Sequence, residues 1–230
     1  MTYVISDLHG YKIEKIQELF EKAGFSNDDQ CYVLGDVIDR GKDSIKLLRW
    51  IMQQPNMHFI LGNHEVMMLE SAEFLEAEEV GGRPSFSSLY SFNLWLSNGG
   101  QTTYNDLQAC HPKIVQSIIN YLRRAPFYKE LTVNGRKFSL THSGLGKFDK
   151  NKTIEDYTDN ELIWNRPGKN DLYYDDVITV FGHTPTLFYD DKYAGKMLRT
   201  RTWIDIDAGA ACGYAPMLLR LDDFQEFYID

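Results

Sequence analysis

The feature that most constrains the fold is a unit of β-type run, polar loop and helical pattern that recurs early in the chain. The apolar β-type runs are Thr2–Ile5, Cys31–Leu34 and Met57–Leu61. The first two are each followed, after a loop, by apolar residues at helical spacing, within residues 11–23 and 44–52. Strands that alternate with helices form a parallel sheet in which successive strands are usually neighbours. The repeat therefore predicts an α/β core with three polar loops on one edge of its sheet.

The remaining sequence predicts a helical insertion and further strands. Residues from about 65 to 124 are mostly helical in pattern, with breaks at glycines and prolines. Two β-type runs, Phe127–Val133 and Arg136–Thr141, flank Asn134-Gly135, a strong signal for a two-residue hairpin turn. Later strands are predicted at residues 176–181, 200–207, 216–221 and 224–229. The late hairpins indicate a second, mixed or antiparallel sheet packed on the first, within a single domain of residues 1–230.

Composition excludes several classes of protein. A net charge of −9 without any compensating run of Lys or Arg disfavours nucleic-acid binding. Apolar stretches are far shorter than the about 20 residues that a membrane span requires, and none resembles a secretory leader. The three cysteines are scattered singly, so neither a disulfide framework nor a cysteine-based zinc site is indicated. We therefore expect a cytoplasmic globular protein with no membrane segment.

Polar side chains with metal-ligating chemistry follow five of the predicted strands. Asp and His two positions apart in an extended segment point to the same side, as a pair of ligands to one cation must. An isolated acidic turn or a lone histidine is more often structural, but five such groups at strand ends make coincidence improbable. The groups are Asp7 with His9, Asp36 with Asp39 and Arg40, Asn63 with His64, His142, and His183.

The number of ligands predicts a site for two divalent cations. The first cation would be held by Asp7, His9 and Asp36, and the second by Asp36, Asn63, His142 and His183, with the Asp36 carboxylate bridging them. Nitrogen and oxygen ligands without a thiolate are typical of manganese, iron or zinc. Two metals ~3.5–4 Å apart clamp the attacking and leaving oxygens of an in-line displacement and generate hydroxide near neutral pH. The predicted chemistry is phosphoester hydrolysis.

Hydrolysis also needs a proton donor and groups that bind the phosphoryl oxygens. His64 is adjacent to Asn63 but faces the other way, so it is the candidate general acid. Asp39 would hold the imidazole of His64 in its productive tautomer. Arg40 would form a forked contact with the phosphoryl oxygens and stabilise the transition state.

These sequence blocks resemble the calcineurin-like metallophosphoesterase superfamily, and within it the bacterial and bacteriophage lambda-type phosphoprotein phosphatases. The blocks occur in the family's order and span residues 6 to 210. They are Ser6-Asp7-Leu8-His9-Gly10, Gly35-Asp36-Val37-Ile38-Asp39-Arg40-Gly41, Gly62-Asn63-His64-Glu65, Thr141-His142-Ser143, Ile163-Trp164-Asn165-Arg166 and Phe181-Gly182-His183-Thr184-Pro185. Lesser matches are Asn98-Gly99-Gly100 and Ile206-Asp207-Ala208-Gly209-Ala210.

The resemblance implies an α/β sandwich of two sheets flanked by helices, with the metallophosphoesterase fold. It implies a dinuclear site usually assayed with manganese, and hydrolysis of phosphomonoesters by metal-bound hydroxide without a phosphoenzyme. It implies the roles given above to Asp39, His64 and Arg40. It also implies that phosphate is bound by Arg166 as well as by Arg40 and Asn63. Two departures, Ser143-Gly144 after His142 and Pro167 after Arg166, touch the outer pocket and not a proposed ligand.

The leading hypothesis is a protein serine/threonine phosphatase that acts on phosphoproteins or phosphopeptides and on small phosphoesters. The closest rival is a symmetrical dinucleoside tetraphosphate hydrolase, which needs a place to stack a base. The insertion offers Phe86, Tyr90, Phe92 and Trp95 for stacking, although their spacing favours a helix packed on the core. A nuclease is disfavoured by the net charge. A binding or scaffold protein without catalysis would be expected to have lost a ligand, and all six proposed ligands are intact.

Overall fold

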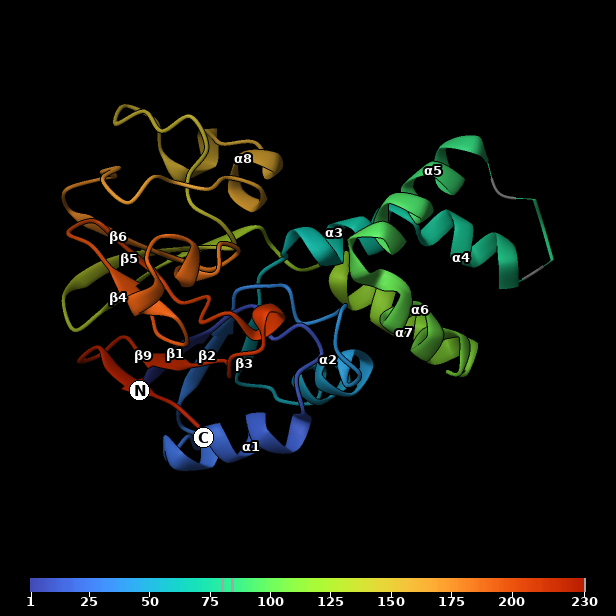
Figure 1. The fold of residues 1–230 in the computed structure, drawn as a ribbon, viewed down its shortest axis with the longest axis horizontal. Coiled ribbons are helices and arrows are strands. Elements are labelled where there is room, and N and C mark those ends of the chain that lie inside the picture. Colours follow the sequence, from blue (N-terminus) through green and yellow to red (C-terminus); the bar gives the residue numbers. More distant parts are fainter. Residues whose placement is uncertain (80, 84, 230) are drawn as a thin grey trace.

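The computed structural model describes residues 1–79, 81–83 and 85–229, and the side chains of all of these except residues 76–79. Two five-stranded sheets pack on each other with helices on the outside, which confirms the predicted α/β sandwich (Figure 1). The first sheet has the order β10-β9-β1-β2-β3. Its strands are β1 (Thr2–Ile5), β2 (Gln30–Val33), β3 (Met57–Phe59), β9 (Leu218–Arg220) and β10 (Gln225–Phe227). The second sheet, β4-β5-β6-β8-β7, contains β4 (Tyr128–Val133), β5 (Arg136–Thr141), β6 (Val177–Phe181), β8 (Trp203–Asp205) and β7 (Leu198–Arg199).

The repeating unit at the start of the chain forms the parallel half of the first sheet. β1 pairs in parallel with β2, and β2 with β3, as the alternation of strands and helices predicts. Helices α1 (Ile13–Lys22) and α2 (Ser44–Met52) cover the outer face of this sheet (Figure 1). Leu19 and Leu48, at 0% exposed, belong to the core cluster that the helices share with the strands. Each such buried side chain contributes about 1.5–3 kcal/mol through removal from water.

The second sheet begins with the predicted hairpin. Asn134 and Gly135 have φ angles of 49° and 77°, which suit the two-residue turn that joins right-twisted strands. β4 and β5 are antiparallel, whereas β5, β6 and β8 are parallel, so the sheet is mixed. Apolar residues of both sheets, including Val4, Leu140 and Val180, fill the space between them.

The last two predicted strands belong to the first sheet, an assignment that the sequence analysis did not make. β9 pairs antiparallel with β1, with Val4 opposite Leu219, and β10 then pairs with β9. The reason is that β1 has one free edge, since β2 occupies the other. Pairing there satisfies the backbone groups of β1 and places Leu219 and Leu221 in the core between the sheets.

Most of residues 63–122 are helical, and these helices stand to one side of the sandwich (Figure 1). They are α3 (Asn63–Glu70), α4 (Ala72–Glu79), α5 (Phe86–Trp95), the π-helical turn η1 (Leu96–Gly100), α6 (Gln101–Gln108) and α7 (Pro112–Leu122). Gly99 in η1 has a φ of 104°, and its carbonyl accepts a 3.0 Å hydrogen bond from Arg40 N–H. This contact joins the insertion to the loop after β2.

The other helical segments are short. They are the α-helix α8 (Asp159–Ile163) and the 3₁₀ turns η2 (Ile154–Asp156), η3 (Thr186–Phe188), η4 (Asp191–Tyr193) and η5 (Ala210–Cys212). Leu162 and Ile163 of α8 pack with Phe181 and Trp203 outside the second sheet. Within the described residues, every helix is too short or too polar to cross a bilayer.

Candidate active site

The loops at the carboxyl ends of β1, β2, β3, β5 and β6 meet at one edge of the sandwich. They surround a pocket of about 270 Å³. The structure brings together all the residues proposed from the sequence to hold metal, to catalyse or to bind phosphate, and every one of them except Arg40 and Arg166 is buried. The pocket-lining members of the proposed set are His9, Asp36, Arg40, Asn63, His64, Arg166 and His183.

Several of these residues have an unusual backbone conformation. A positive φ costs a non-glycine residue about 1–2 kcal/mol, and such strain tends to gather at functional sites. In this site, the positive φ directs polar side chains toward the pocket directly after a strand. The site residues with positive φ are Asp7 (52°), His9 (43°), Asp36 (52°), Asp39 (73°), Arg40 (66°) and His183 (69°).

Two glycines allow the loops to approach one another closely. A Cβ added at Gly182 would overlap the Oδ2 atom of Asp7, and one at Gly62 would overlap the Oδ1 atom of Asp36. Both carboxylates therefore lie against backbone that carries no side chain. This close approach explains the glycine in each of the two loop motifs.

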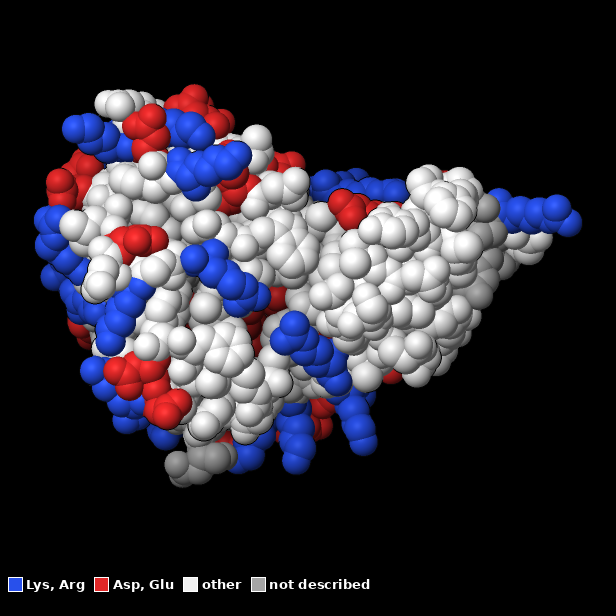
Figure 2. Space-filling view, turned by 45° about the horizontal axis from the view of Figure 1, so that its top comes forward, with Lys and Arg blue, Asp and Glu red and all other residues white. Residues whose placement is uncertain are grey.

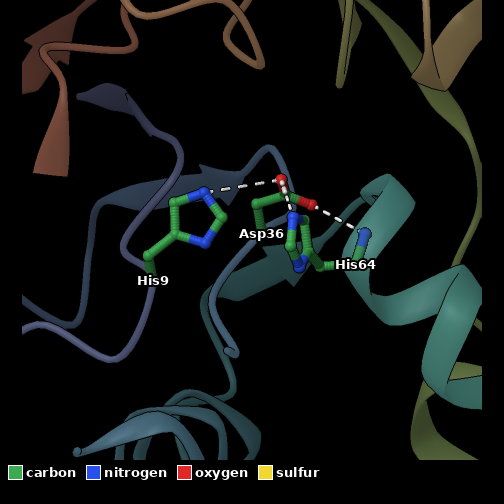
Figure 3. Close-up of side chains that lie close together, drawn as sticks. All are labelled: His9, Asp36 and His64. Carbon is green, nitrogen blue, oxygen red and sulfur yellow. Dashed lines mark hydrogen bonds and ion pairs between the residues drawn. The ribbon is translucent and has the colours of Figure 1, made fainter. Parts of the chain in front are cut away.

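Asp36 lies at the centre of the site (Figure 3). Its Oδ2 atom is 3.7 Å from His9 Nε2, and its Oδ1 atom is 3.4 Å from His142 Nε2. The backbone N–H of His64 donates a 3.0 Å hydrogen bond to Oδ1. The two oxygens thus face two different groups of ligating side chains, as a bridging carboxylate would.

The surrounding side chains leave donor atoms without partners. His9 Nδ1 and His142 Nδ1 lie 3.2 and 2.7 Å from the carbonyls of Ile38 and Leu34, so their Nε2 atoms face the site. Asp7 Oδ2 accepts the backbone N–H of His183 at 2.9 Å. Asp7 Oδ1 and His183 Nε2, by contrast, are buried with no hydrogen-bond partner in the described part of the chain. Unpaired buried donor and acceptor atoms of this kind are what a bound cation would satisfy.

The electrostatics also fit cations. Burial, reinforced by the charge of Asp7, raises the pKa of Asp36 well above its usual value. Burial and Asp7 act in the same way on the pKa of Asp207, which also lines the pocket. Burial, with nearby His142 and Arg166, lowers the pKa of His183 to about 2, so its imidazole is neutral and able to ligate. A concentration of buried carboxylates beside neutral imidazoles favours positive ions.

The ligating atoms form two groups that share one residue. Donor atoms of His9, Asp36 and His64 lie within 4.8 Å of one another, and so do those of Asp36, His142 and His183. Asp7 Oδ1 is 3.9 Å from His9 Nε2, and Asn63 Oδ1 is 2.9 Å from His142 Nε2, so each proposed ligand adjoins one of the groups. The residues present therefore fit a pair of cations with Asp36 between them.

His64 has two well-defined surroundings. Its Nδ1 atom is 2.7 Å from Asp39 Oδ2, and its Nε2 atom is 3.2 Å from a guanidinium nitrogen of Arg40. The Asp39 carboxylate is 0% exposed and accepts two further hydrogen bonds from the insertion. Trp95 Nε1–H donates to it at 2.9 Å, and the Thr103 hydroxyl donates at 2.6 Å.

Trp95 and Thr103 were not predicted as site residues. Trp95 and Phe92 are buried, so the interpretation that they pack in the core was correct for this pair, whereas Phe86 and Tyr90 are exposed. Thr103 lies in no motif, and no local pattern marks it. Their contacts show that the insertion shapes the surroundings of Asp39.

The two arginines lie at the mouth of the pocket. Arg166 donates to the His183 carbonyl at 3.2 Å and to the Thr184 hydroxyl at 3.4 Å. Together with Arg40 it lines the pocket, and Figure 2 shows a hollow with acidic atoms at its floor and basic side chains on either side. The exposed aromatic rings of Trp164 and Phe188 also line it. Sequence reasoning missed Phe188.

Glu65 connects two of the site loops. Its buried carboxylate accepts hydrogen bonds from the backbone N–H groups of Asp36 at 2.8 Å, Val37 at 2.9 Å and Gly62 at 3.1 Å. Glu65 therefore fixes the loop after β2 to the loop after β3. The Glu65 carboxylate supports these loops and does not itself line the pocket.

Replacing Asp36 with Asn should separate metal binding from folding. The amide keeps a carbonyl oxygen for the His64 N–H but removes a buried charge, so we expect the metal-free variant to melt at the same or a higher temperature than the parent chain. Manganese should raise the melting temperature of the parent chain by mass action and leave that of Asp36→Asn nearly unchanged. Thermal melts with and without manganese measure both effects. An equal manganese-induced shift in the two proteins would contradict the site.

The chain is similar in sequence to known phosphoesterases. The sequence model of the calcineurin-like phosphoesterases matches residues 2–208. Serine/threonine-protein phosphatase 2 of Escherichia coli is 26% identical over 164 residues, which cover 70% of this chain and 66% of that protein. The asymmetrical bis(5'-nucleosyl)-tetraphosphatase PrpE of Oceanobacillus iheyensis is 28% identical over 208 residues, covering 80% of this chain and 77% of its own length. This chain thus spans just under two thirds of the Escherichia coli protein.

A solved structure supports the fold. The serine/threonine phosphatase from Saccharomyces cerevisiae superposes with a TM-score of 0.60 at 15% identity, covering all of this chain and 80% of that one. At such low identity the likeness concerns the fold alone. The sequence match across residues 2–208 shows that the chain belongs to the calcineurin-like phosphoesterase family.

Proposed function

We propose that the chain is a metal-dependent phosphomonoester hydrolase that removes phosphate from phosphoserine or phosphothreonine in proteins. The observation that carries the proposal is the hydrogen-bonded pair of His64 and Asp39 beside the Asp36 carboxylate. It supplies a proton donor next to the residues that fit two cations. A site that only bound metal would have no need of such a pair.

The proposed metal ligands are those expected from the sequence. Asp7, His9 and Asp36 would hold one cation, and Asp36 with Asn63, His142 and His183 the other. When bound, two divalent ions lower the pKa of water and neutralise phosphoryl charge. Manganese is the proposed metal, with iron or zinc as alternatives that the nitrogen and oxygen ligands also accept.

The chain's own side chains bind the phosphoryl group and deliver a proton. Arg40 and Arg166, at the mouth of the pocket, would each donate to phosphoryl oxygens. Burial lowers the pKa of His64, but the charge of Asp36 and the hydrogen bond with Asp39 outweigh burial, and the pKa is raised. A raised pKa keeps His64 protonated at Nε2, the atom that faces the pocket, until the departing alkoxide takes the proton.

The size of the pocket favours a phosphorylated side chain as substrate. A volume of about 270 Å³ accommodates a phosphoryl group and a short side chain but little more. The rest of a protein substrate would lie outside, against Trp164 and Phe188, which are 44% and 64% exposed. The same two rings favour a second candidate function, hydrolysis of dinucleoside tetraphosphates, because a nucleobase would stack on them. Phe86 and Tyr90 are exposed but do not line the pocket.

A comparison of two substrates tests the proposed function. We expect manganese-dependent release of phosphate from a phosphoserine peptide, with a higher kcat/KM than for hydrolysis of a dinucleoside tetraphosphate. The physical reason is that the pocket of about 270 Å³ has room for a phosphorylated side chain but not for a nucleotide. Phosphate assays and chromatography of the nucleotide products give the two rates. A chain that cleaved only the dinucleotide would establish the second candidate, and a chain that took up no metal and cleaved neither would be a binding protein.

The variant His64→Asn tests the general acid. With the phosphoserine peptide, whose leaving group needs a proton, kcat should fall by about 10²–10⁴-fold. With 4-nitrophenyl phosphate, whose leaving group is stable as an anion, the fall should be at least about tenfold smaller. Steady-state kinetics on both substrates measure the contrast. Equal losses on the two substrates would refute the acid role.

Thr103→Val tests whether the insertion positions Asp39. The isosteric change removes the hydrogen bond to Asp39 Oδ1 and the partner of the Asp39 N–H, each worth about 1–3 kcal/mol. We expect kcat on the peptide to fall about tenfold with little change in KM, and a smaller fall on 4-nitrophenyl phosphate. The matched control is Thr102→Val, because the Thr102 hydroxyl is buried without a hydrogen-bond partner among the described residues. If both variants behaved alike, positioning of Asp39 by Thr103 would be excluded.

A further inference from the structure

A second and larger hollow lies away from the candidate active site, beside the outer edge of β3. It has a volume of about 700 Å³, and no residue lines both this hollow and the active-site pocket. Its other walls come from α7 and from β4, the edge strand of the second sheet. Hollows of this size are typical of sites for small organic ligands.

The lining is rich in aromatic rings. Tyr32 of β2 and His58 of β3 lie on the same face of the first sheet, with ring centroids 4.9 Å apart and planes 31° apart. On the α7 side, Tyr121 meets Phe59 edge to face at 5.9 Å. Burial raises the pKa of Tyr121 to about 12, so its ring is a neutral surface. These rings offer flat faces and edges to an aromatic ligand.

Two cations lie at the rim of the hollow. Arg124 and Lys129 line it and are exposed, and neither forms an ion pair with a carboxylate within the part of the chain that the structure describes. His58 and Lys129 both line this hollow, and burial together with the charge of Lys129 lowers the pKa of His58. The whole chain carries a net charge of −9, so two cations that have no ion-pair partner among the described residues, placed beside an aromatic lining, favour an anionic ligand here.

The geometry favours a small molecule over an extended peptide. β3 has only three residues, so its free edge is about 10 Å long. The chain after α7 closes the end of that edge, because Leu61 N–H donates to the Pro126 carbonyl at 2.9 Å. A peptide strand would need a longer open edge to form a ladder of hydrogen bonds.

We propose that this hollow is a second binding site, and that its ligand is a small organic anion with an aromatic ring. The ring would lie among Tyr32, His58 and Tyr121, and the anionic group would contact Arg124 and Lys129. The guanidinium and ammonium groups donate to carboxylate, sulfonate or phosphate oxygens alike. The proposal stands independently of the proposed phosphatase activity, since the two pockets share no residue.

The test uses two fluorescent dyes with the full chain, in manganese and with saturating inorganic phosphate to occupy the active site. The anionic dye is 8-anilino-1-naphthalenesulfonate, and the neutral dye of the same shape is N-phenyl-1-naphthylamine. We expect one anionic dye to bind per chain with a dissociation constant below about 1 mM. The double variant Arg124→Gln/Lys129→Gln should weaken binding of the anionic dye by at least about tenfold and change that of the neutral dye by less than about twofold.

Two more variants locate the dye. Asn120→Trp places a large side chain on the α7 wall and should reduce binding of both dyes. Lys113→Gln removes an exposed charge from the same helix outside the hollow and should change neither. Phosphatase activity should be the same in all these variants. The proposal is overturned if the anionic dye fails to bind, or if the double variant and Asn120→Trp leave its affinity unchanged.

Discussion

The buried carboxylate of Glu65 makes the contacts on which the geometry of the candidate active site depends. By accepting N–H groups from Asp36, Val37 and Gly62, it fixes the loop after β2 to the loop after β3. Asp36 is thereby held with one oxygen toward His9 and the other toward His142. Because each of these N–H groups would otherwise be buried without a partner, the loops and the carboxylate stabilise one another. The hydrogen bonds explain how the two loops are held in one arrangement around the site.

The same site lowers the stability of the folded chain. Asp7, Asp36 and Asp207 are buried close together, and burial with mutual repulsion raises the pKa of Asp36 and of Asp207. Left-handed backbone at positions such as Asp36 and His183 adds strain. Clustered charge and strain of this kind persist where function requires them and the surrounding structure compensates. Cations bound between the carboxylates and imidazoles would offset the repulsion, which relates the instability of the site directly to its proposed chemistry.

The features that could be predicted from the sequence are those that depend on residues close together in the chain. The parallel strands were predicted from the alternation of apolar runs and helical patterns. The hairpin turn was predicted from the residue types of Asn134 and Gly135. Each of these patterns involves residues that are close together in the chain. Pairing of β9 with β1 was missed, since it depends on which edge remains free after the other strands have paired. The contacts of Asp39 with Trp95 and Thr103, 56 and 64 residues away, were missed for a similar reason. No spacing rule connects an insertion helix to a loop of the sandwich.

We propose that side chains from five strand ends hold two cations that share Asp36. Crystals grown with manganese and measured on either side of its absorption edge would locate these cations. We expect two anomalous peaks, one between the Asp36 carboxylate and His9 and one between that carboxylate and His142. An anomalous map with no peak at Asp36, or with a single peak that Asp36 does not contact, would contradict this proposal.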